Sequence, residues 1–203
     1  QGCAVREGLV QRCPNPPYNQ RPLAPWEGCA FWLFCDHDAP MTSVHIRPAT
    51  TTDADTIAPL FDAYRQFYEQ TPDLAGARAF IAERLEREES VILLALDATQ
   101  TAVGFCQLYP TFCSVEAAPI YTLYDLFVAP AARQTGVGRS LLRAAEATAH
   151  AHGKVRRDLT TAHTNTNAQK LDESLGWTLD TVFRAYIESA SLNLKYPFGL
   201  SLS

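Results

Sequence analysis

The sequence lacks the features of a nucleic-acid-binding or membrane-spanning protein. Its 203 residues contain 17 Lys and Arg against 22 Asp and Glu, so the net charge is −5 and there is no excess of positive charge to bind a polyanion. No apolar run approaches the roughly 20 residues that span a bilayer. Apolar residues nevertheless make up 47% of the chain, which is typical of a globular protein with a core. We therefore expect neither a nucleic-acid partner nor a membrane partner.

The cysteines lack the spacing of a structural metal site. Four of the six lie in the first 40 residues, and no two of them form a Cys-x2-Cys pair. These four are Cys3, Cys13, Cys29 and Cys35. We therefore expect no metal. The remaining pair, Cys106 and Cys113, suits a reducing compartment, so the expected localisation is cytoplasmic.

The composition changes at Met41, the only methionine of the chain. Residues 1–40 are rich in cysteine and proline and show neither helical nor strand periodicity. We expect them to be a non-native or dispensable extension, followed by a domain at 41–190 and a tail at 191–203. The alternative is an interaction protein whose active part is the segment 1–40, which deletion of that segment would test.

Hydrophobic periodicity predicts an α/β protein. Strands are expected at 44–47, 91–96, 103–109, 120–128 and 155–161, with one or two more at 178–189. Helices are expected at about 53–68, 74–88, 136–152 and 167–175. This order predicts a central sheet of mixed direction flanked by helices.

A glycine turn lies between the strand ending at Val128 and the helix that follows. Gly136 and Gly138 have no Cβ, so main-chain N–H groups can approach an oxygen-rich ligand at the positive end of the helix. Arg133 and Arg139 could add positive charge at the rim. The segment is neither a Walker A loop nor a G-x-G-x-x-G fingerprint. Taken alone, the two glycines are equally compatible with a tight turn that binds nothing.

Two motifs in the same order resemble those of the GNAT superfamily of N-acetyltransferases. Residues 123–128 followed by 133–142 are similar to motif A, whose acetyl-CoA loop reads Q/R-x-x-G-x-G/A. Residues 165–177 resemble motif B, and the segment 46–50 resembles the first strand. The resemblance covers about residues 43–190 and looks closest to the polyamine and histone acetyltransferase-like branch. It implies a mixed, mostly antiparallel central sheet flanked by helices, with a splayed cofactor cleft.

The resemblance also implies an acetyl-CoA site without a metal. The pantetheine arm is expected on Leu126, Phe127 and Val128, and Asn165 is expected to position it. The pyrophosphate is expected on the turn formed by Arg133, Gln134, Thr135, Gly136, Val137, Gly138 and Arg139. The implied reaction is direct acetyl transfer to an amine of a small molecule or peptide, with a main-chain N–H of Phe127 or Val128 polarising the thioester carbonyl.

The general base is less clear from the sequence. Tyr124 stands where polyamine acetyltransferases have a Glu, and a tyrosine with a pKa near 10 is a poor base. Asp125 is ionisable, but neighbouring residues of a regular strand point to opposite faces, so both are not expected to reach one substrate. A water relay to Asp125 or Glu116 remains open, as does a purely structural role for Asp125.

Asp172 departs from the family pattern, because it stands where motif B usually has the tyrosine that protonates the departing thiolate. An ionised carboxylate cannot donate that proton, whereas a buried, protonated one can. Tyr124 is the other candidate acid. A thiol with a pKa near 8.5 needs little help to leave, so the departure should slow the reaction without abolishing it. The alternative function is an acetyl-CoA-binding module with weak or lost turnover.

The sequence gives the least information about the identity of the acetyl acceptor. Acidic residues at Glu69, Asp73 and Glu116 would suit a cationic polyamine if they lined the acceptor site. A homodimer is expected only by resemblance to the family.

Overall fold

The computed structural model describes residues 44–188, so the predicted extension at 1–40 and the tail at 191–203 lie outside the described residues. Within the described part of the chain, five strands form one sheet in the order β1-β2-β3-β4-β5. The strands are β1 (His45–Pro48), β2 (Val91–Leu96), β3 (Ala102–Cys113), β4 (Ala118–Val128) and β5 (Arg157–Leu159). The first four pair antiparallel, and β5 runs parallel to β4. The expected mixed, mostly antiparallel sheet is confirmed.

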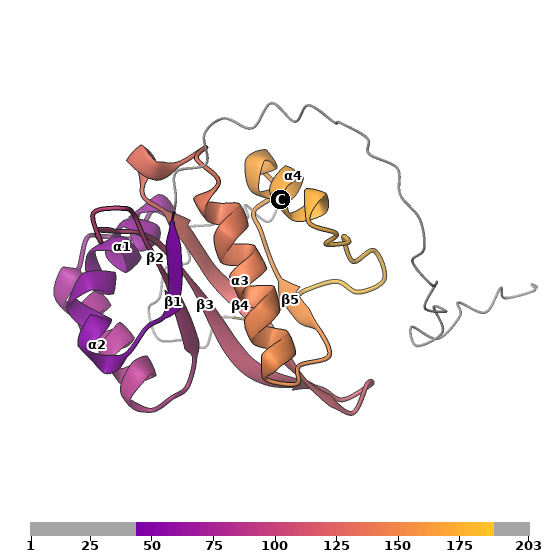
Figure 1. Cartoon of the computed structure of the whole chain (residues 1–203). Helices are drawn as coiled ribbons and strands as arrows, with labels where there is room; N and C mark the ends of the chain where they lie inside the picture. Colours follow the sequence, from indigo (N-terminus) through magenta and orange to yellow (C-terminus); the bar gives the residue numbers. More distant parts are fainter. Residues whose placement is uncertain (1–43, 189–203) are drawn as a thin grey trace, which may run out of the picture. The chain divides into compact units, whose positions relative to one another are not determined.

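Helices pack on both faces of the sheet (Figure 1). They are α1 (Ala54–Phe67), α2 (Leu74–Glu86), α3 (Val137–Ala151) and α4 (Thr166–Ser174), with short 3-10 turns at Thr51–Asp53 and Pro130–Ala132. Because side chains alternate along a strand, Leu93 packs in the cluster with α3 while Leu94 packs in the cluster with α1 and α2. No helix among residues 44–188 is long and apolar enough to cross a membrane.

Polar contacts connect β1 to the 3-10 turn that leads into α1. The guanidinium of Arg47, at the end of β1, contacts the carboxylate of Asp53 at 2.7 Å, and the main-chain N–H of Thr50 donates to the same carboxylate at 2.7 Å. The hydrogen bond from Arg47 is the main reason why the pKa of Asp53 lies well below its usual value. These contacts connect the first strand to the helix that borders the site.

One expectation for the fold is wrong. No strand occurs at 178–188, where the apolar pattern predicted one or two. The carboxylate of Asp180 accepts hydrogen bonds from the main-chain N–H groups of Val182 and Phe183, a local turn that competes with pairing to a strand. Large apolar side chains of this segment are 77–84% exposed: Leu179, Val182, Phe183, Tyr186 and Ile187. Apolar periodicity alone does not provide a strand with a partner.

Candidate active site

β4 separates from β5 and opens a cleft. Only residues 121–123 of β4 pair with β5, so its end at 124–128 has no strand partner on that side within the described residues. Leu126, Phe127 and Val128 line a cavity of about 1080 Å³, together with residues of α1, of the turn before α3 and of α4. The expected splayed cleft is confirmed, and its exposed main chain can accept hydrogen bonds from, or donate them to, an extended ligand.

The turn between β4 and α3 presents the start of α3 to this cavity. Gly136 has a φ of 89°, a left-handed conformation that favours glycine, and directly precedes the helix. Gly138 lines the cavity as well, and a Cβ there would lie 3.4 Å from Leu171 and 3.9 Å from Val128. Glycine therefore leaves room for a ligand beside the unpaired N–H groups of the first helical turn, which is the geometry of an anion site.

The side chains of the turn divide into two groups. Arg133, Gln134 and Arg139 line the cavity with the two glycines. Thr135 and Val137 do not line it: the Thr135 hydroxyl donates to the main-chain oxygen of Ala132 at 2.8 Å, and Val137 is buried in the core. These two residues shape the turn, and any contact they make with a ligand would come from their main chain.

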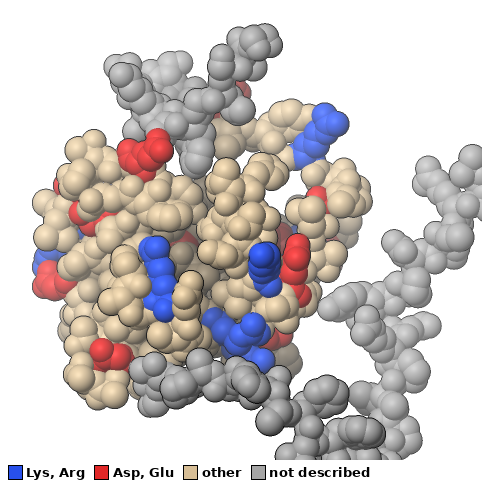
Figure 2. Space-filling view, turned by 90° about the horizontal axis from the view of Figure 1, so that it is seen from above, with Lys and Arg blue, Asp and Glu red and all other residues tan. Residues whose placement is uncertain are grey.

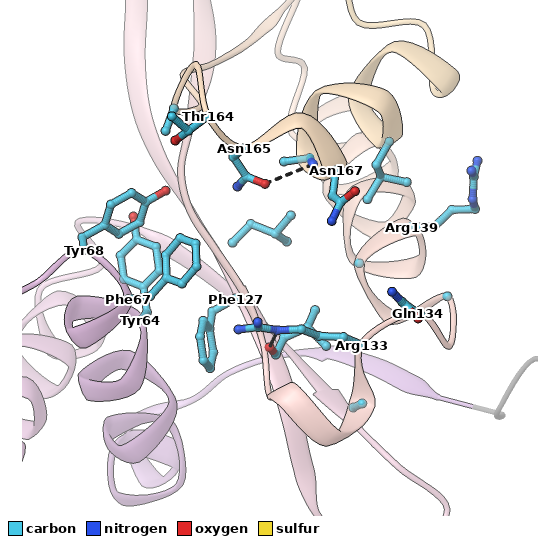
Figure 3. Close-up of a pocket in the computed structure, with 18 of the residues that line it drawn as sticks. Tyr64, Phe67, Tyr68, Phe127, Arg133, Gln134, Arg139, Thr164, Asn165 and Asn167 are labelled. Carbon is cyan, nitrogen blue, oxygen red and sulfur yellow. Dashed lines mark hydrogen bonds between the residues drawn. The ribbon is translucent and has the colours of Figure 1, made fainter.

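Arg133 connects the turn to α1. Its Nε donates to the main-chain oxygen of Val128 at 3.0 Å, and its guanidinium carbon lies 5.6 Å from the ring centroid of Phe127 and 5.9 Å from that of Phe67. Figure 3 shows this arrangement, with aromatic side chains on the α1 side of the cavity and polar side chains on the α3 and α4 side.

α4 contributes the opposite wall. Asn165 precedes the helix, and its side-chain oxygen accepts a hydrogen bond from the main-chain N–H of Ala168 at 3.2 Å (Figure 3). This cap fixes Asn165 at the cavity, where the sequence predicted it. Thr164 and Asn167 line the same wall and were missed by sequence reasoning. Their position beside Asn165 in motif B is the only signal that could have found them.

A β-bulge changes the expectation for Tyr124 and Asp125. Gln107 pairs with Asp125 and Leu108 pairs with Leu123, so Tyr124 is an extra residue without a partner on β3. The rule that neighbouring side chains point to opposite faces therefore fails here. Both Tyr124 and Asp125 contribute to the raised pKa of Tyr64 on α1, so both lie near that helix. Neither of the two lines the cavity, and Tyr124 is 64% exposed whereas Asp125 is 5% exposed.

Asp125 is a buried carboxyl among tyrosines. It is 5% exposed, and burial raises its pKa to about 6, partly opposed by a hydrogen bond with the Tyr64 hydroxyl. Its charge also helps to raise the pKa values of Tyr68 and Tyr109, after burial. Asp125 does not itself line the cavity, but its neighbour Leu126 and its partner Tyr64 do. A group that reaches the cavity through one hydroxyl or one water can exchange a proton with bound ligand.

The other candidate acids and bases lie elsewhere. Asp172 is 7% exposed, and burial raises its pKa to about 6. It is not a lining residue, although Leu171 beside it is. Glu116 pairs with Arg156 at 2.8 Å. This ion pair occupies the carboxylate that would have to accept a proton if a water relay led to Glu116.

Comparisons with known proteins agree with this geometry. The model of the acetyltransferase (GNAT) family matches residues 57–177, which is more than half of the chain. The protein belongs to the GNAT family. It is 50% identical over 143 residues to the uncharacterized N-acetyltransferase YhfO of Bacillus subtilis strain 168, across 70% of this chain and 95% of that protein.

Solved structures of similar proteins extend the comparison. The crystal structure of a probable acetyltransferase is 39% identical, with a TM-score of 0.69, and covers 72% of this chain and 98% of its own. An aminoglycoside N-acetyltransferase in complex with CoA is 20% identical, with a TM-score of 0.62, and covers 73% of this chain and 96% of its own, which shows a shared fold. The GNAT protein described here is thus an N-acetyltransferase, and its family uses acetyl-CoA as the acetyl donor.

Within residues 44–188 no group of three or more His, Cys, Asp or Glu side chains is arranged to hold a metal ion. The residues present fit a CoA-type ligand instead. A strand end with open main chain, a glycine that keeps the cavity clear and a helix N-terminus are all parts of one cavity.

Proposed function

We propose that this GNAT protein transfers an acetyl group from acetyl-CoA directly to a primary amine of a small molecule or peptide. The observation that carries the proposal is the position of Asp125, a buried carboxyl on the open end of β4, one residue before the cavity-lining Leu126. The cavity beside that strand end is large enough for an extended cofactor and an acceptor together. The domain proposed at 41–190 encloses the family match at 57–177.

The cofactor is proposed to lie along the cavity from α3 to α1. Leu126, Phe127 and Val128 would bind the pantetheine arm through their main chain. The turn at 133–139 would bind the pyrophosphate, and Asn165 would orient the arm from α4. These assignments are supported by the lining of the cavity, by the left-handed Gly136 and by the open edge of β4.

Asp125 is proposed as the general base. An alkylammonium ion has a pKa near 10 and must lose a proton before its nitrogen can attack the thioester carbonyl. A carboxyl with a pKa of about 6 is mostly ionised at neutral pH and is a stronger base than an ordinary aspartate. The proton would pass to it through a water or through the Tyr64 hydroxyl, whose contact with Asp125 supports this path.

The leaving thiolate is proposed to take its proton from Tyr124 rather than from Asp172. Neither residue lines the cavity, but Tyr124 is 64% exposed and lies two residues before the lining Leu126, whereas Asp172 is 7% exposed. Protonation is a minor contribution in either case, because a thiol with a pKa near 8.5 is a good leaving group at neutral pH. The absence of a tyrosine at 172 is therefore compatible with turnover.

The test is the release of CoA from acetyl-CoA by the full chain, with and without primary amines. Amine-dependent release that falls in Asp125→Asn and partly recovers in Asp125→Glu is the expected result. Binding of acetyl-CoA without amine-dependent release would contradict the proposal and favour a binding module that has lost turnover, as the departure at Asp172 suggested.

A further inference from the structure

Three aromatic side chains of α1 and its last turn form one wall of the cavity, which we call the aromatic wall: Tyr64, Phe67 and Tyr68. The ring centroids of Tyr64 and Tyr68 lie 5.1 Å apart, as do those of Phe67 and Tyr68. Spacings of three and four residues place these side chains on one side of a helix. Phe127 of β4 continues the wall, with its ring centroid 6.4 Å from that of Tyr64. Figure 3 shows these rings together on the α1 side, opposite Asn165 and Asn167.

One ring of the aromatic wall, that of Phe67, is not buried in the hydrophobic core. Phe67 is 53% exposed although it lines a cavity, and a large apolar side chain in such a position often marks a ligand site. The guanidinium of Arg133 already lies over Phe67 and Phe127, at 5.9 and 5.6 Å. These rings therefore already contact one cation, which their quadrupoles stabilise, and the exposed part of Phe67 offers an apolar surface to a ligand.

Carboxylates near the wall are few. Glu69 is the only acidic residue that lines the cavity in the described part of the chain, and Asp125 lies buried behind Tyr64. Two further acids from the sequence are engaged away from the cavity. Asp73 caps α2 by accepting from the N–H of Gly76, and Glu116 pairs with Arg156. Seen from above, the molecule carries charged side chains in small separate groups on a mostly tan surface (Figure 2).

The aromatic rings and the single lining carboxylate favour some classes of amine over others. A polycation would need several carboxylates along its length, and the cavity offers it one at the rim. A single ammonium group needs only one carboxylate, and Asp125 is reached from the cavity through the hydroxyl of the lining Tyr64. An apolar or aromatic body attached to that group would cover the exposed Phe67.

We infer that the acceptor is a small primary amine with one positive charge on an apolar or aromatic body, bound against the aromatic wall. This inference rests on the proposed function, because it names the substrate class of the same site. It departs from the polyamine that the sequence suggested.

The experiment measures equilibrium binding of 2-phenylethylamine and of spermidine to the full chain by titration calorimetry, with and without CoA. We expect 2-phenylethylamine to bind at least about tenfold more tightly than spermidine. Phe67→Ala should weaken 2-phenylethylamine about tenfold, the size of one lost aromatic contact, while Phe67→Tyr restores it. Phe112→Ala removes an equally large ring that is 77% exposed on β3 and outside the cavity, so binding should not change.

The inference would be overturned if spermidine bound more tightly than 2-phenylethylamine and lost this affinity in Glu69→Gln. It would also be overturned if Phe67→Ala left the affinity for 2-phenylethylamine unchanged. Acetylation is followed separately by CoA release. Binding of 2-phenylethylamine without acetylation would contradict the proposed function and leave the recognition of the amine intact. Efficient acetylation of spermidine alone would support the function and overturn the substrate class.

Discussion

The hydroxyl of Tyr64 on α1 donates to the main-chain oxygen of Tyr124 on β4 at 3.4 Å. Tyr124 is the extra residue of the bulge, so this contact joins the helix that forms the aromatic wall to the irregular point of the central strand. The same hydroxyl interacts with the carboxyl of Asp125. One tyrosine therefore connects Asp125, the proposed base, with the bulge and with the aromatic side of the cavity.

Replacement of Asp125, the proposed base, should lower kcat without changing the affinity for acetyl-CoA. Asp125→Asn keeps the size of the side chain but removes its ability to accept a proton, so we expect kcat for amine acetylation to fall by about 10² to 10⁴. The affinity for acetyl-CoA, measured by titration calorimetry, should stay within about twofold of the native protein. Asp125→Glu is the matched control and should retain a larger fraction of the rate. An unchanged kcat in Asp125→Asn would exclude Asp125 as the base.

The rate should depend on pH through the same group. If Asp125 is the base as proposed, its ionised form accepts the proton, and because its pKa is raised to about 6, kcat/KM should rise as the pH increases through 6. Deprotonation of the amine adds a further rise at higher pH. A pH profile measured with one amine should lose the lower limb in Asp125→Asn. A lower limb that persists in that variant would belong to another group.

The raised pKa of Asp125 also predicts that stability falls as the pH rises, whereas the rate of acetylation rises. Because the folded protein holds its proton up to about pH 6 and an unfolded Asp loses it near pH 4, the folded state binds more protons in this window and its stability falls as the pH rises from 4 to 6. Well above pH 6 Asp125→Asn should therefore be more stable than the native protein by about 3 kcal/mol, since each pKa unit corresponds to about 1.4 kcal/mol. Urea unfolding at pH 8 and at pH 4 measures the difference, which should disappear at the lower pH.

The sequence predicted the elements that have a local signal. The apolar face of α3, with Leu141, Leu142, Ala145 and Ala149, repeats at helical spacing and is buried in the structure. The glycine turn before it was recognised because Gly136 and Gly138 stand at a strand-to-helix junction. Both line the cavity.

Features that depend on pairing were not predictable in the same way. The bulge at Tyr124 exists only relative to the register of β3, and no residue type marks it. The aromatic wall was not predictable from residue spacing, because spacing does not distinguish a ring in the core from one in a cavity. The one or two strands expected at 178–189 do not form within 178–188, because apolar periodicity does not supply a partner strand.

Two glycines with similar backbones allow a controlled test of the cofactor site. Gly136 and Gly153 both have positive φ, 89° and 65°, so an alanine at either position should cost about 1 kcal/mol of stability. Only Gly136 lines the cavity. Gly136→Ala should therefore raise the KM for acetyl-CoA about tenfold or more, while Gly153→Ala leaves it unchanged. Equal effects of the two changes on KM would mean that the turn acts through stability and not through binding.

Asp172→Tyr tests how far the departure from motif B matters. Asp172 is buried and its carboxyl is outside the cavity, so a tyrosine there replaces a small buried side chain with a large one and requires α4 to shift. We expect lower stability by about 1 to 3 kcal/mol and no gain in kcat. Asp172→Asn keeps the volume and should leave kcat within about threefold, because a thiolate of pKa near 8.5 departs without a strong acid. Thermal unfolding and CoA release measure the two effects. A kcat that rises tenfold in Asp172→Tyr would show that protonation of the thiolate limits the native enzyme and that position 172 reaches the reacting sulfur.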